Sequence, residues 1–167
     1  MILYHGSLEI IEEPNPFIGR KNVDFGQGFY LTDLREQAVR WINRRKRQAS
    51  QKKGFLNIYE YTENSDLKIK KFNGYCEEWL DFVILNRAGS DIPKNMDYDV
   101  VIGNVADDEV IVAVDSYIES LAKGRATKNT KLALLDELSF SYPNNQYAFK
   151  TILSLNFLKF INSEAFQ

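Results

Sequence analysis

The sequence predicts a single α+β domain that spans residues 1–167. Strand-like segments lie at both ends of the chain, and helical segments lie between them. This order lacks the regular strand–helix alternation of a doubly wound sheet, and it favours an α+β sheet instead. A length of 167 residues and a hydrophobic fraction of 44 % suit one folded domain with one core.

The first segments are predicted to be a strand, a loop and a second strand. Ile2–His5 is a short apolar strand that Gly6 ends, and two prolines within residues 12–23 predict a loop. After the glycine-rich turn at 24–28, the triplet Phe29–Leu31 is β-prone. The chain therefore returns to a strand before its first helix begins.

That first helix is predicted from Leu34 to about Gln51. Thr32 or Asp33 can cap its first turn, and Glu36 stands at capping-box distance from Asp33. Gly54 is predicted to end it. The apolar face carries Leu34, Ala38, Trp41 and Ile42, and the basic face carries Arg40, Arg44, Arg45, Lys46 and Arg47.

The remaining segments include one ambiguous stretch at residues 107–121. Val110 and Val112 favour a strand there, whereas the length of the stretch and the spacing of Tyr117 and Leu121 favour a helix. We predict a helix from about 108 to 122, a loop at 89–95 and a turn at 143–145. The other predicted strands are Phe55–Tyr61, Leu67–Phe72, Tyr98–Ile102, Gln146–Lys150 and Leu158–Ala165, and the other predicted helices are Glu77–Arg87 and Leu132–Phe140.

Composition excludes several kinds of site and partner. The single cysteine, Cys76, cannot form an intramolecular disulfide, and the single histidine, His5, excludes a multi-histidine metal centre, so we expect no metal. A net charge of −2 implies no global attraction to nucleic acid or membrane. Neither a signal peptide nor an apolar run of ~18 residues is visible, so a cytoplasmic protein is expected, with export that needs no cleaved signal as the alternative.

The stretch Asp24–Trp41 combines a glycine turn, a β-prone triplet and a helix start, which is typical of a polar-ligand site. Gly26 and Gly28 allow a ligand to approach main-chain N–H groups. This is no dinucleotide fingerprint, because Leu31 stands where the third glycine is required. Without further information, a lone histidine or a tyrosine in such a context is more often structural than functional.

Several segments, in this order along the chain, resemble the ADP-ribosyltransferases of the diphtheria-toxin and poly(ADP-ribose) polymerase type. They are Tyr4-His5-Gly6-Ser7, then Phe25–Asp33 followed by Ala38 and Trp41, and near the C-terminus Asn145-Gln146-Tyr147. Residues 55–140 do not align. The resemblance implies a split mixed sheet of two packed halves with flanking helices, and an NAD cleft between the halves.

The resemblance also implies how NAD is held. The Gly6 backbone would hydrogen-bond the nicotinamide amide, and His5 would bond a ribose hydroxyl that Ser7 also reaches. Tyr30 and Trp41 would stack on the two faces of the nicotinamide ring. Gly28 would admit this end of NAD, whereas Ala38 stands where many members carry a serine that bonds the amide.

Gln146 departs from the family pattern, in which a glutamate bonds the ribose and, in polymerising members, activates the acceptor. With His5 and Tyr30 it would complete the catalytic set. Glutamine accepts a hydrogen bond but cannot take a proton or carry negative charge, so polymer formation is not expected. A surrogate carboxylate from Asp107, Asp108 or Glu109 is an alternative to reading these acids as a helix N-terminal cluster.

The expected function is binding of NAD, cleavage of its nicotinamide–ribose bond and transfer of one ADP-ribose to a protein or nucleic acid. The resemblance suggests a small bacterial toxin or effector, with an antitoxin or immunity protein as a candidate partner. Three alternatives stay open: an NAD glycohydrolase, a regulatory domain that binds NAD with little turnover, and a nucleic-acid binder that uses its basic helix. That basic face, within residues 40–53, is either a solvated surface or a contact for an acidic acceptor or the NAD pyrophosphate.

Overall fold

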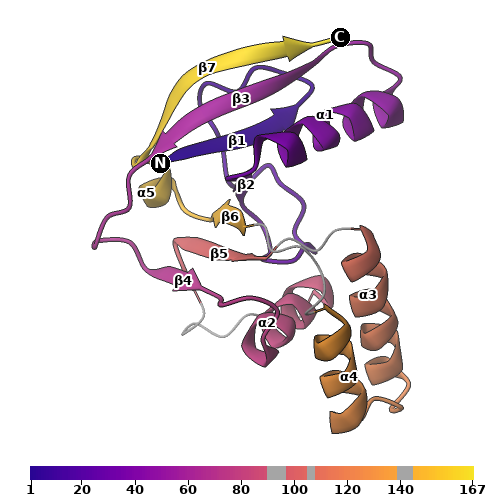
Figure 1. Ribbon diagram of the computed structural model, residues 1–167. Coiled ribbons are helices and arrows are strands. Elements are labelled where there is room, and N and C mark those ends of the chain that lie inside the picture. The colour runs from indigo at the N-terminus through magenta and orange to yellow at the C-terminus, as the bar shows by residue number, and fades with distance from the viewer. Residues whose placement is uncertain (90–96, 105–107, 139–144) are drawn as a thin grey trace.

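The computed structural model describes residues 1–89, 97–104, 108–138 and 145–167. Within them, seven strands form one mixed sheet in the order β4-β5-β6-β2-β1-β3-β7 (Figure 1). Neighbouring strands are antiparallel except for the parallel pair β4 and β5. The strands are β1 (Ile2–Ser7), β2 (Phe29–Thr32), β3 (Gly54–Tyr61), β4 (Ile69–Lys71), β5 (Val100–Asn104), β6 (Asn145–Phe149) and β7 (Leu158–Phe166).

The described residues also form five helices, which confirms the predicted α+β class. α1 packs on β1 and β3, where Ala38 and Ile42 meet Leu56 in a small core. α2, α3 and α4 gather at the other end of the molecule from β7 (Figure 1). The helices are α1 (Arg35–Ala49), α2 (Glu77–Arg87), α3 (Asp108–Ala122), α4 (Lys128–Leu138) and α5 (Ile152–Leu155).

The two faces of the sheet are covered by different cores. Side chains alternate between the faces of a strand, so neighbours along β2 belong to different cores. Phe29 and Leu31 pack with Tyr59 on one face. Tyr30 packs on the other face with the core that contains Ala148 and the apolar sides of α2, α3 and α4. The alternation thus places Tyr30 apart from its two sequence neighbours.

The sheet is least paired where β1 meets β2. These strands share one register pair, Tyr4 with Thr32, whereas β2 and β6 share four pairs. On its other side β1 pairs with β3 along its whole length, from Ile2 to Ser7. The sheet is continuous through the Tyr4–Thr32 pair, so the predicted division into two separate halves is not confirmed.

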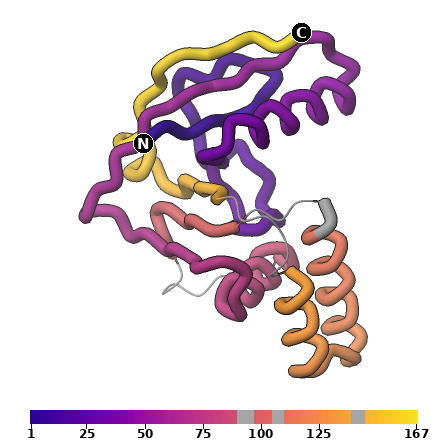
Figure 2. The backbone as a smooth tube through the Cα atoms, viewed as in Figure 1, coloured from indigo at the N-terminus to yellow at the C-terminus, as the bar shows by residue number. Residues whose placement is uncertain are grey.

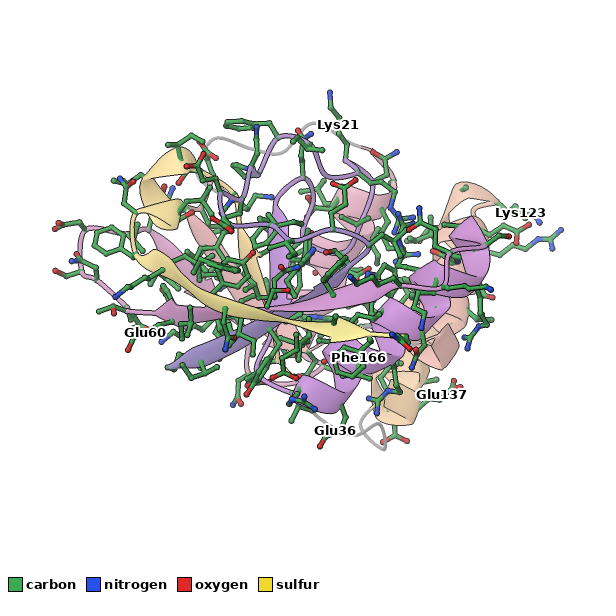
Figure 3. All side chains as sticks on the ribbon, turned by 90° about the horizontal axis from the view of Figure 1, so that it is seen from above. Lys21, Glu36, Glu60, Lys123, Glu137 and Phe166 are labelled. Atoms are coloured by element: carbon green, nitrogen blue, oxygen red, sulfur yellow. The ribbon has the colours of Figure 1, made fainter. Side chains whose placement is uncertain are left out.

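The last strand fastens α1 to the sheet. β7 runs beside β3 along the outer edge (Figure 2). Phe166 lies at the end of β7, over α1 (Figure 3), and packs against the Ala38–Ile42 core. Arg35, in the first turn of α1, forms an ion pair with Glu164, and its guanidinium carbon lies 5.8 Å from the centre of the Phe166 ring.

The predicted cap of the first helix is wrong. α1 begins at Arg35, and its N-cap residue is Leu34, which makes no side-chain cap hydrogen bond. The Oγ1 atom of Thr32 accepts from the Leu34 amide at 3.1 Å, so this hydroxyl turns the chain one residue before the cap. The expected capping box of Asp33 and Glu36 therefore does not form.

The first helix ends within two residues of the predicted Gln51, but Gly54 is not the residue that ends it. Ser50 ends α1 with a φ of 52°, in the left-handed region. Its amide donates to the carbonyl of Arg47 at 3.3 Å, as in a helix C-terminus that closes with a left-handed residue. Gly54 belongs to β3 instead, where a Cβ would lie 3.2 Å from the Ser7 carbonyl oxygen.

The other helices agree with the prediction in different degrees. α2 and α3 match the predicted 77–87 and 108–122, so a helix is confirmed for the ambiguous segment. α4 starts earlier than predicted because Thr127 Oγ1 accepts from the Thr130 amide at 3.2 Å and acts as a cap. α5 was not predicted. Most of the predicted loop at 89–95 and turn at 143–145 lies outside the described residues. No helix of the described part is long and apolar enough to cross a bilayer.

Candidate functional site

The Tyr30 hydroxyl forms hydrogen bonds to the glycine turn at residues 24–28. Its hydroxyl donates to the Gly26 carbonyl and accepts from the Phe25 amide at 3.2 Å. Burial, with a smaller contribution from the negative charge of Asp24, raises the pKa of the Tyr30 hydroxyl well above its usual range. The hydroxyl therefore stays protonated and serves as a structural hydrogen-bond donor.

The glycines of this turn are required by its geometry. Gly26 has a φ of 75°, which glycine adopts without strain. A Cβ on Gly28 would lie 2.9 Å from the Phe149 carbonyl oxygen, because the turn approaches β6 closely. The two glycines that the sequence singled out thus let residues 24–28 fold against the sheet next to Tyr30.

The backbone of Gly6 points toward β2. Met1 and Tyr61 exchange both of their backbone hydrogen bonds, at 2.7 and 2.8 Å, where β1 meets β3. Bonding direction alternates along an antiparallel strand, so odd-numbered residues of β1 face β3 and even-numbered residues face β2. Tyr4 uses this direction to pair with Thr32. Gly6 presents its N–H and C=O on the same side, beyond that last pair.

The His5 side chain forms a hydrogen bond to β2 where the next backbone hydrogen bond between β1 and β2 is expected. Continuation of the β1–β2 ladder would join Gly6 to Tyr30, but no such register pair exists among the described residues. The Tyr30 carbonyl oxygen is instead bonded to His5 Nδ1 at 2.6 Å. The imidazole thus substitutes for a ladder hydrogen bond, and Gly6, which pairs with Leu56 of β3, forms no register pair with β2.

The protonation of His5 follows from this contact. A carbonyl oxygen only accepts, so Nδ1 carries the proton and Nε2 is the acceptor in the neutral ring. Burial lowers the pKa of His5 below its usual 6.5, and the hydrogen bond to Tyr30 opposes this with a smaller effect. The ring centre lies 4.5 Å from that of Phe29. His5 is therefore a neutral, oriented imidazole at pH 7.

α1 lies directly over Gly6. A Cβ at this position would collide with the Ala38 carbonyl and lie 2.9 Å from Ile42 Cγ1. Ala38 itself is almost fully buried where α1 packs on Gly6, which is consistent with its small side chain. Gly6 is thus required by helix packing as well as by any role of its backbone.

Ser7 is engaged within the protein. Its hydroxyl donates to the Glu9 carbonyl and accepts from Asn57 Nδ2 at 2.9 Å. Asn57 is fully buried and also accepts from the Ile11 amide at 3.0 Å. These bonds order the chain that leaves β1, and they give Ser7 a structural part that the sequence did not predict.

Gln146 lies on the same sheet face as Tyr30. It is in register with Thr32 of β2 and Gly103 of β5, and Ala148, two residues later, is in register with Tyr30. Its Nε2 atom is buried and has no hydrogen-bond partner within the described residues. A buried amide donor normally has a partner, so Gln146 Nε2 is a hydrogen-bond donor that the described residues leave unsatisfied.

Asp33 directly follows Thr32 and is the carboxylate nearest in sequence to the Thr32–Gln146 pair. From the sequence, Asp33 was predicted only as a helix cap and not as a residue of the site. Asn145 Nδ2 donates to Asp33 Oδ2 at 3.3 Å, and Asp33 Oδ1 is buried without a partner among the described residues. The predicted alternatives at Asp107, Asp108 and Glu109 lie outside the described side chains.

Trp41 lies at the surface of α1. The structure buries Ala38 and Ile42 of the predicted apolar face but leaves 39 % of Trp41 exposed. The Arg44 guanidinium carbon lies 5.5 Å from the centre of the Trp41 ring. Trp41 is thus available to a ligand. Arg40, Arg45 and Arg47 of the basic face are exposed as well.

Two further side chains, those of Arg87 and Lys150, hold the glycine turn, and neither contact was predicted. Arg87 of α2 bonds Asp24 at 2.6 Å and Asp115 of α3 at 3.0 Å, which ties the turn to two helices. Lys150, directly after β6, donates from Nζ to the Phe25 carbonyl. The partners are far apart in the chain, so no sequence spacing reveals them.

The contacts above define the region. Hollows among the described residues include one of about 560 Å³ beside β4 and one of about 800 Å³ on α3 and α4. Neither is lined by His5, Tyr30 or Gln146. The described residues hold no cluster of three or more His, Cys, Asp or Glu side chains suited to a metal ion.

Comparison with known proteins places the chain in one family. The family described as "Protein of unknown function (DUF3990)" matches residues 1–160. The chain belongs to the DUF3990 family. No curated protein and no solved structure matches this DUF3990 chain. The family match spans every segment of the candidate site, from His5 to Gln146.

Proposed function

We propose that the chain binds NAD, cleaves its nicotinamide–ribose bond and transfers one ADP-ribose to a protein or nucleic acid. The observation that carries the proposal is the unpaired edge of Gly6 beside Tyr30. A role as a bacterial toxin or effector, with an antitoxin or immunity protein as partner, belongs to the same proposal and rests on the sequence resemblance.

The Gly6 backbone matches the carboxamide of nicotinamide. A carboxamide has one NH₂ donor and one carbonyl acceptor on the same side, and a backbone N–H and C=O offer the complementary pair. The direction of the β1–β3 hydrogen bonds supports such a pair on the β2 side of Gly6. The single Tyr4–Thr32 pair leaves room for a ligand edge to continue where the ladder stops.

This opening also supports the split-sheet architecture of the ADP-ribosyltransferases as part of the proposal. β1-β3-β7 with α1 form one half, and β4-β5-β6-β2 with α2, α3 and α4 form the other. The halves adjoin through Tyr4 and Thr32. His5 and Gly6 come from the first half, and Tyr30 and Gln146 come from the second, so the ligand would lie between them.

Aromatic rings supply the walls of the proposed nicotinamide slot. Because the Tyr30 hydroxyl is bonded to the glycine turn, its ring is held in one orientation. Trp41, exposed on α1, is the second ring. Stacking of a cationic pyridinium on an aromatic face contributes ~0.5–2 kcal/mol per good contact. His5 Nε2 would accept from a ribose hydroxyl.

The chemistry requires a shift of positive charge from the ring to the sugar. When the bond between ribose C1′ and the nicotinamide nitrogen breaks, its electron pair stays on that nitrogen, and the ribose becomes oxocarbenium-like. The acceptor then forms the new bond to C1′ and releases its proton to solvent, while neutral nicotinamide leaves. Gln146 can accept a hydrogen bond from the ribose, but it offers no charge. Loss of one such electrostatic contribution typically costs on the order of 3 kcal/mol, which favours slow, single transfer over polymer formation.

NAD labelled on its adenine half tests the proposal directly. The protein is incubated with this NAD and an extract of protein and nucleic acid, beside the Tyr30→Ala variant and a matched Tyr117→Ala control on α3. We expect macromolecule-bound label with the wild type and the control, and little with Tyr30→Ala. Free ADP-ribose alone would identify a glycohydrolase. Bound but intact NAD would contradict an enzyme and leave a binding domain, the reading that Gln146 favours.

A further inference from the structure

Lys150 lies beneath the glycine turn on the sheet face of Tyr30 and Gln146. It follows β6 directly, and side-chain alternation places residues 146, 148 and 150 on one face. Its Cγ would lie 3.6 Å from a Cβ added to Gly28, and its Nζ would lie 3.0 Å from one added to Gly26. The lysine thus reaches under the turn from the strand that carries Gln146.

Lys150 and Tyr30 together bond consecutive groups of one short segment. Lys150 Nζ donates to the Phe25 carbonyl, and the Tyr30 hydroxyl accepts from the Phe25 amide and donates to the Gly26 carbonyl. Asn86 adds a third polar group, since its Oδ1 atom is buried against Gly26 without a hydrogen-bond partner in the described residues. The path of the turn is therefore set by buried polar groups.

The ammonium group is held in an unfavourable environment. Burial lowers the pKa of Lys150 to about 8, and the negative charge of exposed Asp97 raises it by a smaller amount. A lysine whose pKa is lowered in the folded state destabilises the fold when it is charged. A neutral apolar side chain of the same length avoids this cost but leaves the Phe25 carbonyl without the Lys150 donor.

The other carboxylates near the turn have their own partners. Asp24 is bonded by Arg87 at 2.6 Å, and Asp99 Oδ1 accepts from Thr151 Oγ1 at 2.6 Å. Among the described residues, the Lys150 ammonium donates a hydrogen bond to the main-chain carbonyl of Phe25 and not to a carboxylate. The charge of Lys150 is thus directed at the turn itself.

We propose that Lys150 is a positioning residue of the candidate site, whose charged ammonium group holds the Phe25–Gly26 segment in the conformation that sets the Tyr30 ring for ligand binding. The part that concerns NAD rests on the proposed function, whereas the part that concerns the turn does not. A buried charged group that is costly to desolvate, yet orders a ligand-binding loop, is typical of functional residues.

The test compares the wild type with Lys150→Met, Lys150→Gln and the control Lys159→Met, an exposed lysine on β7, at pH 7 and pH 9. Calorimetry measures NAD affinity, and hydrogen exchange measures the protection of amides 24–30 after correction for intrinsic rates. The charged fraction of a lysine with a pKa near 8 falls about tenfold as the pH rises to 9. The comparison with Lys150→Met separates the effect of Lys150 from that of every other group on the protein.

We expect the wild type and Lys159→Met to lose NAD affinity about fivefold to tenfold between pH 7 and pH 9, with a parallel loss of protection at 24–30. Lys150→Met should bind weakly at both pH values, and Lys150→Gln should fall between them at pH 7. A wild-type profile that is flat, or a step that Lys150→Met shares, overturns the proposal. If no variant binds NAD while protection of the turn still follows Lys150, the proposed function fails and the positioning role stands.

Discussion

The hydroxyl and the ring of Tyr30 make different contacts. The hydroxyl is bonded to the peptide groups of Phe25 and Gly26, and the ring lies among side chains of the core that α2, α3 and α4 cover. A buried hydroxyl with two main-chain partners cannot be removed without leaving both partners unsatisfied. Tyr30 therefore has a structural role in the turn, and the proposed function adds a separate role for its ring as an aromatic wall.

Removal of the hydroxyl alone separates these roles. Tyr30→Phe should lower the free energy of unfolding by about 1–3 kcal/mol, because the Gly26 carbonyl and the Phe25 amide lose a buried partner. Urea unfolding measures this, with Tyr117→Phe on α3 as the control expected within about 0.5 kcal/mol of the wild type. Equal stability of Tyr30→Phe and the wild type would contradict the hydrogen bonds described here.

His5 gives the chain a distinct response to acid. Its pKa is lowered in the folded state, so the unfolded chain binds a proton more readily as the pH falls below 6.5. The contribution of His5 to stability should therefore be complete above pH 6.5 and be lost as the pH falls through its lowered pKa. His5 is the sole histidine of the chain, so its contribution is separable.

The measurement compares urea unfolding of the wild type and His5→Asn at pH 7.5 and pH 5.5. The wild type should lose more stability than the variant over this interval. Parallel losses in both proteins would show that His5 titrates in the folded state as it does in the unfolded chain, against the burial seen here.

At the level of elements, the contact of α1 with β1 decides the residue at position 6. The nearest obstacle to a side chain on Gly6 is the main-chain carbonyl of Ala38, followed by Ile42. A flexible side chain can move aside, but the backbone of a helix in contact with two strands moves only as a unit.

Gly6→Ala should therefore lower the free energy of unfolding by about 1–3 kcal/mol through overpacking. The double variant Gly6→Ala/Ile42→Val should recover little of this loss, because the carbonyl of Ala38 remains in place. Denaturant unfolding of the two variants and of Ile42→Val alone checks the prediction. Full recovery in the double variant would mean that Ile42 alone resists the added methyl group.

Local patterns predicted the elements well where one signal dominates. α2 has the predicted bounds because a dense run of apolar residues lies between polar residues, and β6 and β7 agree closely with the predicted strands. The cap and the terminating glycine predicted for α1 were wrong because tertiary contacts decide them. Thr32 bonds the Leu34 amide from the end of β2, and Gly54 is needed inside β3.

The candidate site was likewise predictable only in part. Sequence motifs singled out His5, Tyr30 and Gln146, and the sheet brings their strands together through β2, which lies next to both β1 and β6. The long-range contacts were not predictable, because Lys150 lies 125 residues from Phe25 and Arg87 lies 63 residues from Asp24. No local pattern encodes such pairings, and only the fold reveals them.

At the level of the whole molecule, β1 and β2 share fewer register pairs than any other neighbouring strands of the sheet. The strands on either side have their own helices, and one register pair joins them. A ligand that contacts Gly6 on one side and Tyr30 on the other would connect both sets of strands. Such a ligand binds the folded state alone and stabilises it by mass action.

NAD should therefore raise the thermal midpoint of the wild type, by an amount that grows with its concentration. At a hundredfold excess over its dissociation constant, the stabilisation is about 2.7 kcal/mol. Tyr30→Ala should show a much smaller shift at the same concentration, and Tyr117→Ala should behave like the wild type. An equal shift in Tyr30→Ala would place the binding of NAD elsewhere on the chain.

A crystal structure of the protein soaked with nicotinamide or NAD would show where the nicotinamide ring binds. We expect the ring to lie against Tyr30, with its carboxamide bonded to the N–H and C=O of Gly6 beyond the Tyr4–Thr32 pair. Trp41 should approach the other face of the ring. A ligand bound away from Tyr30, or a Gly6 backbone paired with β2 in the presence of saturating NAD, would contradict the account.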